Sequence, residues 1–190
     1  MPIPAESVTR VLQWRRKQQA VRPAIGLVMF EFSRFWPTDY AHGRDFIADL
    51  DKFLGQLPKG WPYGVEMRNR NWLKPEYFEC LARHQVTHVF NSWDAMPPVS
   101  EQMALPGSRT NPDLIAARLL LKPGRKYEQA VKAFEPYDST KEENPEARAA
   151  GKALVAEGKA AGPKRKTFVF VNNRLEGNAI GTIAALLETC

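Results

Sequence analysis

Residues 25–32, IGLVMFEF, are nearly continuous apolar sequence, and this stretch decides the class of fold. Such a run is typical of a parallel strand covered on both faces, since a half-solvated strand would alternate apolar and polar residues. Four further segments are short apolar runs bounded by turn residues: 63–68, 87–91, 117–122 and 167–173. Helical patterns occur at 44–57, 75–84, 127–134, 142–159 and 178–187. Because strands and helices alternate, the sequence predicts an α/β fold with a parallel sheet and outer helices.

The composition is that of a domain that can bury a core, with 44% hydrophobic and 25% charged residues in a chain of 190. No segment approaches the roughly 18 uninterrupted apolar residues that a membrane-spanning helix needs. The N-terminus lacks the apolar centre of a secretion signal. We therefore expect a cytoplasmic protein without a membrane partner.

The cysteines and histidines do not form a metal-binding motif. Cys80 and Cys190 are the only cysteines and lie far apart, so neither a disulfide framework nor a cysteine-based zinc site is expected. His84 and His88 have the i, i+4 spacing of a zinc-binding helix, but Gln85 stands where the catalytic glutamate of that motif would be. We expect no metal site, and the sequence indicates no particular cofactor.

The chain is basic, with 27 Lys and Arg against 21 Asp and Glu and a formal net charge of +6. Part of this charge lies in residues 1–23, interpreted as a basic, solvated N-terminal segment ahead of a domain over 24–190. A second basic cluster is Lys164-Arg165-Lys166, and loop tryptophans offer stacking surfaces for bases. One hypothesis is therefore a nucleic-acid-binding module that uses both clusters.

Polar residues close every predicted strand, and parallel sheets bind ligands outside the carboxyl ends of their strands. Glu66 and Arg68 are two residues apart, so they share one face of a strand and can pair or hold a ligand between them. Of the neighbours Asn172 and Asn173, strand parity favours Asn172 as the residue that faces the crevice. The whole set is Glu31, Glu66, Arg68, Asn91, Asp94, Lys122, Asn172 and Asn173.

Three motifs occur in order along the chain: VEMR at 65–68 with Trp72, Arg118-Leu119 in the fourth strand, and FVNN at 170–173 followed by GNA at 177–179. Together they resemble the domain of unknown function 72 family (DUF72, YecE-like) over about residues 24–188. The resemblance implies a TIM-barrel-like fold and no established enzymatic activity, and it supplies no reaction. It also implies a barrel mouth that contains Glu66, Arg68, Arg118, Asn172 and Asn173.

Three departures from the family pattern bear on the predicted fold and site. The region 122–166 is longer than in short family members. The acidic residue that members show after the next strand falls here at Asn91 or Asp94, which leaves its role open. Members also begin with a strand resembling GTSGW and further elements before the segment that matches 25–32, and the sequence has none of these. With about five strands where a closed barrel has eight, we expect the C-terminal portion of an N-terminally truncated barrel. Its uncovered strand edge predicts self-association.

The strand-end residues suit a small anionic or phosphorylated ligand. Whether the protein is an enzyme stays open; if it is, a hydrolase-type reaction is favoured, with Glu66 or Asp94 as general base. Arg68 or Lys122 would then stabilise negative charge. A nucleic-acid-binding module and a non-functional truncated remnant stay open as alternatives. The ligand-binding candidates are Trp72, Asn91, Arg118, Lys122, Asn172 and Asn173.

Overall fold

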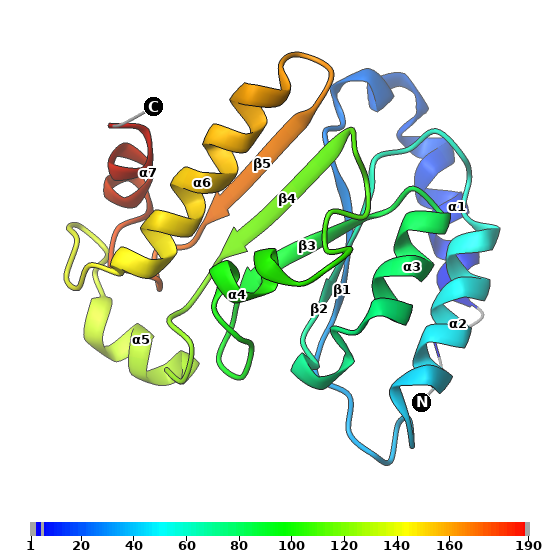
Figure 1. Ribbon diagram of the computed structural model, residues 1–190, viewed down its shortest axis with the longest axis horizontal. Coiled ribbons are helices and arrows are strands. Elements are labelled where there is room, and N and C mark those ends of the chain that lie inside the picture. The colour runs from blue at the N-terminus through cyan, green and yellow to red at the C-terminus, as the bar shows by residue number, and fades with distance from the viewer. Residues whose placement is uncertain (1–2, 5, 189–190) are drawn as a thin grey trace.

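The computed structural model describes residues 3–4 and 6–188. Within these residues, five parallel strands form one sheet in which each strand lies beside its neighbour in the sequence (Figure 1). The α/β class and the predicted strands are confirmed. The strands are β1 (Val28–Phe32), β2 (Tyr63–Met67), β3 (Thr87–Ser92), β4 (Leu114–Leu119) and β5 (Lys166–Val171).

Most helices between the strands pack on one face of the sheet, with α6 (Pro145–Ala161) along β4 and β5 (Figure 1). Every helix that the sequence predicts is present, with ends that differ by a few residues. No helix in the described ranges, 3–4 and 6–188, is long and apolar enough to cross a membrane. The helices are α1 (Glu6–Lys17), α2 (Gly43–Gln56), α3 (Pro75–Arg83), α4 (Val99–Ala104), α5 (Tyr127–Phe134), α6 (Pro145–Ala161) and α7 (Ala179–Leu187), with 3-10 turns η1 (Gln19–Ala24) and η2 (Arg70–Trp72).

The first hydrophobic core lies between α2 and the convex face of β1 and β2. The predicted apolar stripe of α2 is buried in it. Phe30 of β1 meets Phe53 edge-on with ring centroids 5.0 Å apart, and Phe32 meets Phe46 at 5.3 Å. Because side chains alternate along a strand, Glu31 between them faces the opposite side of the sheet.

That opposite face is concave. Arg118 of β4 reaches Glu31 of β1, with 2.8 Å between Nη1 and Oε2, although the two strands are not neighbours in the sheet. Phe168 of β5 lies against Gly26, just ahead of β1, where an added Cβ would be 2.4 Å from the ring carbon Cζ. Gly26 therefore gives the space that the curvature requires. This curvature brings the side chains of distant strands together, as in part of a barrel.

The N-terminal segment is folded, whereas the sequence analysis treats it as solvated. Helix α1 packs Val8 and Val11 against the first core, and Trp14 meets Trp61 edge-on at 5.6 Å. The basic residues of its last turn interact favourably with the helix dipole. Apolar residues recur every third position in this segment, at Val8, Val11 and Trp14. Because most of the other residues are charged or polar, the charge pattern alone does not predict the helix.

Strand β4 begins and ends three residues earlier than the predicted 117–122. Residues 114–121, LIAARLLL, are apolar except for Arg118, so no periodicity marks the ends of the strand. The prediction that Lys122 closes this strand is therefore wrong. Lys122 lies beyond it and pairs with Glu142 at 3.1 Å.

Candidate ligand-binding site

Four charged side chains meet on the concave face of the sheet. Glu31 and Glu66 are register partners in β1 and β2, Arg68 directly follows β2, and Arg118 comes from β4. Two carboxylates and two guanidiniums balance one another. The sheet's curvature, rather than the sequence spacing, brings Arg118 into this group.

Glu66 is the anchor of the network, because its side chain is 0% exposed. Its Oε1 accepts a hydrogen bond from Arg68 Nε at 2.9 Å, as the two-residue spacing predicts. Its Oε2 accepts from Arg118 Nη1 at 2.5 Å. A buried carboxylate needs such partners, so Glu66 fixes the positions of both guanidiniums.

Glu31 is the exposed member of the network, with 35% of its side chain accessible. Its Oε2 forms an ion pair with Arg68 Nη2 at 2.9 Å and accepts a hydrogen bond from Arg118 Nη1 at 2.8 Å. Burial alone would lower the pKa of Arg118, but its hydrogen bonds to Glu31 and Glu66 outweigh burial and raise the pKa. One carboxylate oxygen at the edge of solvent is thus held by two guanidiniums.

A cavity of about 290 Å³ adjoins the network at the carboxyl ends of β1 and β2. Arg68 lines it, and the guanidinium of Arg68 also lies 4.1 Å from the centroid of the Trp93 ring, a cation–π contact. Trp72 forms part of the wall and stacks on Phe35. Two further arginines, Arg34 and Arg70, contribute to the lining, and none of the described lining residues is acidic.

Asn91 lies beside the network and links neighbouring elements through hydrogen bonds. It is fully buried and in register with Arg118, and its Nδ2 donates to the carbonyl of Met67 at 3.0 Å. Gln102 of α4 bonds both the amide and the carbonyl of Asn91. These contacts tie β2, β3 and α4 together behind the arginines.

Asp94 and Lys122 belong to separate ion pairs in the loops after β3 and β4. Asp94 pairs with Lys126 at 2.6 Å, and Lys122 with Glu142. Neither makes a hydrogen bond or ion pair with Glu66 within the described part of the chain.

Asn172 and Asn173 stabilise the chain after β5. Asn172 Oδ1 accepts from the amide of Arg174 at 3.0 Å, and Asn173 Oδ1 accepts from the amide of Ala179 at 2.8 Å. Their side chains are thus used in local turns rather than in the charged network.

The sequence analysis does not select Arg34, Arg70 or Trp93 as site residues, and it names Glu31 only as a strand end. The two arginines follow strand ends by two to three residues, which is a usable signal. Trp93 gives no signal beyond its position in a loop. The position of Glu31 opposite Arg118 depends on the curvature of the sheet.

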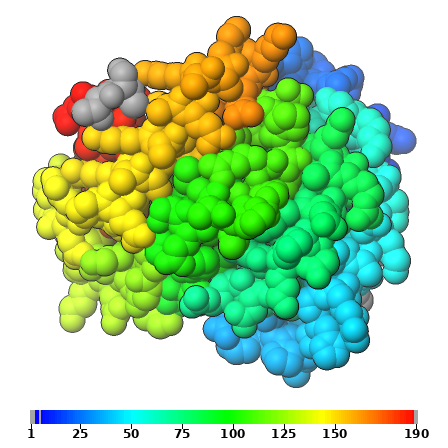
Figure 2. Space-filling view, viewed as in Figure 1, coloured from blue at the N-terminus to red at the C-terminus, as the bar shows by residue number. Residues whose placement is uncertain are grey.

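A second, basic cavity of about 620 Å³ lies at the amino ends of the strands. Arg22 lines it together with Lys164 and Lys166, so residues from both basic clusters meet there. Lys59 adds a fourth cation, and Asp113 is the one acidic residue among the described residues of the lining. Figure 2 shows the chain around residue 160 beside the N-terminal segment at this end of the molecule.

A parallel sheet curved toward a barrel, with helices outside and a charged network at the strand carboxyl ends, defines a TIM-barrel-like α/β protein. The sequence pattern of the family described as "Protein of unknown function DUF72" matches residues 4–190, and the chain belongs to this family.

Solved structures agree with this fold. A DUF72 family protein from Enterococcus faecalis V583 is 16% identical with a TM-score of 0.64, over 96% of this chain and 65% of that one. A DUF72 family protein from Thermotoga maritima MSB8 is 21% identical with a TM-score of 0.60, over 93% and 62%. The chain thus spans less than two thirds of the length of these two proteins. A search of curated proteins gives no match.

Proposed function

We propose that the protein binds a small anionic or phosphorylated ligand at the strand carboxyl ends, through Arg68 and Arg118. One observation carries the proposal: Glu31 Oε2 forms ion pairs with both guanidiniums, at 2.8 Å from Arg118 Nη1 and at 2.9 Å from Arg68 Nη2. A carboxylate or phosphate oxygen of a ligand has the same charge and bonding geometry. Glu31 therefore occupies the place of the ligand's anionic group.

Ligand binding replaces Glu31 and leaves Glu66 in position. Glu31 is partly exposed and can turn into solvent, whereas Glu66 is fully buried and keeps both guanidiniums oriented. The adjoining cavity, with Trp72, Arg34 and Arg70, holds the remainder of a small ligand. Its arginines favour a ligand with more than one negative group.

The contacts support binding more strongly than hydrolysis. A general base needs a free lone pair aimed at the reacting proton. Both oxygens of Glu66 accept hydrogen bonds from guanidiniums, and Asp94 is paired with Lys126. A reaction that used Glu66 or Asp94 as a base would first have to break one of these pairs.

The test is calorimetric titration of the full chain with inorganic phosphate and with a small phosphate monoester. Arg118→Gln should weaken binding at least about tenfold, because a hydrogen bond to a charged group contributes about 1.5–3 kcal/mol. Glu31→Gln should tighten it, because the competing charge is gone. Arg16→Gln, which changes an exposed arginine in the last turn of α1, is the matched control. Equal affinity in Arg118→Gln and wild type, or no binding in Glu31→Gln, would overturn the proposal.

A second candidate function is nucleic-acid binding, and the basic cavity at the amino end favours it. Lys164 and Lys166 are exposed in this cavity, whereas Arg165 pairs with Glu157 at 3.1 Å. Replacing both lysines with Ala should reduce the salt slope of single-strand binding by about 1.4, at about 0.7 per phosphate contact. Arg165→Gln should change the slope less. Absence of oligonucleotide binding at low salt would remove this candidate.

We also propose that the edge of β1 supports self-association. The amide of Val28 donates to Pro62, and the carbonyl of Phe32 accepts from Arg68, so these alternate peptides point toward β2. The peptide groups of Met29 and Glu31 therefore point away from it, and within the described residues β1 has no second strand partner. A second copy can pair there.

A further inference from the structure

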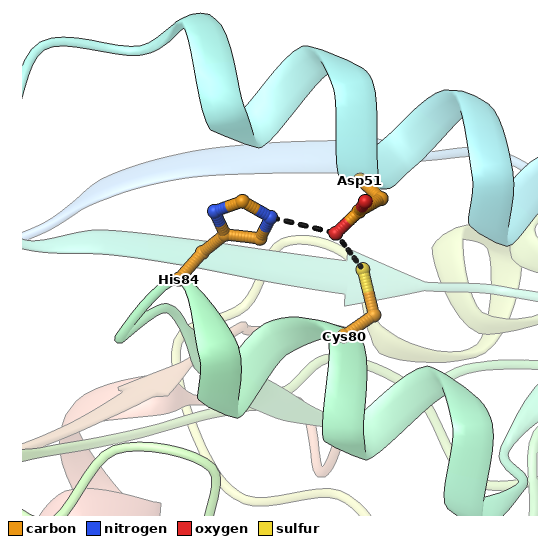
Figure 3. A group of neighbouring side chains, drawn as sticks. All are labelled: Asp51, Cys80 and His84. Atoms are coloured by element: carbon orange, nitrogen blue, oxygen red, sulfur yellow. Dashed lines mark hydrogen bonds and ion pairs between the residues drawn. The ribbon is translucent and has the colours of Figure 1, made fainter.

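Three potential metal ligands converge on the helix-covered side of the sheet, between α2 and α3 (Figure 3). Asp51 extends from α2, and Cys80 and His84 extend from α3 and its C-terminal cap. The spacing of four residues puts Cys80 and His84 on one helix face. Asp51 Oδ1 lies 2.8 Å from His84 Nε2 and 3.8 Å from Cys80 Sγ, and all three ligand atoms lie within 4.8 Å of one another.

We propose that Asp51, Cys80 and His84 form a binding site for a divalent transition metal, with zinc favoured by the donor set. Thiolate sulfur, imidazole nitrogen and carboxylate oxygen are the three ligand types that zinc takes in proteins. Three protein ligands leave the fourth tetrahedral position for water or an external ligand. The sequence predicts no such site, because Asp51 is distant from Cys80 and His84 along the chain and belongs to neither a Cys-x-x-Cys nor a His-x-x-x-His spacing.

The geometry needs little adjustment. Zinc bonds of about 2.0–2.3 Å in a tetrahedron place ligand atoms about 3.3–3.8 Å apart. The distance from Cys80 to Asp51 already has this value, and the 2.8 Å between Asp51 and His84 must open slightly. The separation of Cys80 from His84 is at most 4.8 Å and closes by at most about 1.5 Å, by side-chain rotation.

The Arg83 guanidinium and the proton of the Cys80 thiol both affect how strongly the site binds a metal. Arg83 Nη1 lies 2.8 Å from Asp51 Oδ1 and competes with a metal for that oxygen. The Arg83 side chain is 62% exposed, so it can turn into solvent when a metal binds. The Cys80 thiol carries a proton at neutral pH, because burial and the nearby Asp51 raise its pKa to about 11. Binding therefore replaces the thiol proton with the metal and releases it to solvent.

The site lies on a different layer from the Glu66 network, so it is independent of the anion-binding proposal. Cys80 is buried, and Asp51 and His84 are half-buried, which gives a metal access from one side. Without a metal, Asp51 and His84 already link α2 to α3. A bound metal would strengthen this link and stabilise the folded chain.

The experiment titrates the full chain with Co²⁺ and then Zn²⁺, in a Cys190→Ser background that leaves Cys80 as the only thiol. We expect one cobalt per chain, a thiolate-to-cobalt charge-transfer band in the near ultraviolet, loss of the band on adding zinc, and a higher melting temperature with zinc. Arg83→Gln should tighten binding because a competing cation is removed. Absence of the charge-transfer band would overturn the proposal.

Variants at the ligands separate a built site from accidental binding. Cys80→Ser should abolish the band, and His84→Gln should weaken zinc binding by more than about tenfold, since changes even to outer-shell partners of a metal cost this much. His42→Gln is the matched control, because His42 is an exposed histidine at the start of α2. If the buried Cys80→Ser change prevents folding, His84→Gln decides alone. Unchanged zinc affinity in folded His84→Gln would contradict the site.

Discussion

Replacing Glu66 with Gln tests whether this carboxylate anchors the arginines. The change keeps the volume of a side chain that is 0% exposed and removes its charge. The amide of Gln can accept one hydrogen bond, and its NH2 group then faces a guanidinium. Arg68 and Arg118, which are 11% and 22% exposed, keep only the partly exposed Glu31 as a charged partner.

The expected loss of stability follows from these contacts. Glu66 accepts two charge-assisted hydrogen bonds, at 2.9 and 2.5 Å, each of which contributes about 1.5–3 kcal/mol. Removing one partner of a buried ion pair typically costs about 3–5 kcal/mol. Because Glu31 still contacts both arginines, we expect the lower end, about 3 kcal/mol. This is a large fraction of the roughly 5–15 kcal/mol that stabilises a domain.

Urea unfolding followed by circular dichroism gives the measurement. With a slope of about 2–3 kcal/mol/M, the Glu66→Gln midpoint should fall by about 1 M or more. Glu31→Gln is the matched control, and its cost should stay below about 1 kcal/mol because Glu31 is partly solvated. A loss below about 1 kcal/mol for Glu66→Gln, or equal losses in the two variants, would refute the anchoring role.

Three further predictions concern pH, the sheet edge and the concave face. Burial lowers the pKa of His88 from 6.5 to about 3. The unfolded chain thus binds a proton that the folded chain does not. The free energy of unfolding should therefore fall by up to about 1.4 kcal/mol per pH unit as the pH drops from about 6.5 toward 3. His88→Phe should remove this pH dependence. Met29→Pro, which removes no hydrogen bond to β2, should make the protein monomeric in sedimentation velocity. Gly26→Ala should cost about 1–3 kcal/mol through its clash with Phe168, less in a Phe168→Leu background.

Each of these has a clear contrary outcome. Retention of the acid slope in His88→Phe, set against unchanged behaviour of His42→Gln, would assign the slope to other groups. A wild-type chain that sediments as a monomer would remove the edge proposal. Additive effects of the Gly26 and Phe168 changes would mean that the two positions do not interact.

The local features of the fold could be predicted because their causes are local. The nearly continuous apolar run at 25–32 and the apolar stripe of α2 each depend on a few consecutive residues. The ends of β4 could not be predicted, since LIAARLLL offers no boundary. Helix α1 could not be predicted from charge, because its basic residues outnumber the apolar row of Val8, Val11 and Trp14. Helix α4 lies among prolines, whose usual effect is to interrupt helices.

The candidate site also has one part that follows from local sequence and another that depends on the three-dimensional fold. The pairing of Glu66 with Arg68 follows from a spacing of two along one strand. The contact of Arg118 with Glu31, 87 residues apart, depends on how far the sheet curves, which no short segment encodes. The three potential metal ligands likewise combine an i, i+4 pair from α3 and its C-terminal cap, whose spacing the sequence shows, with Asp51 from another helix.

The anomalous scattering of a crystal soaked in tungstate, a heavy analogue of phosphate, tests the central claim most directly. The account predicts a tungsten peak within hydrogen-bond distance of Arg68 Nη2 and Arg118 Nη1, with Glu31 turned into solvent and Glu66 unmoved. Glu31 still bonded to both guanidiniums in a crystal that takes up tungstate elsewhere would contradict it.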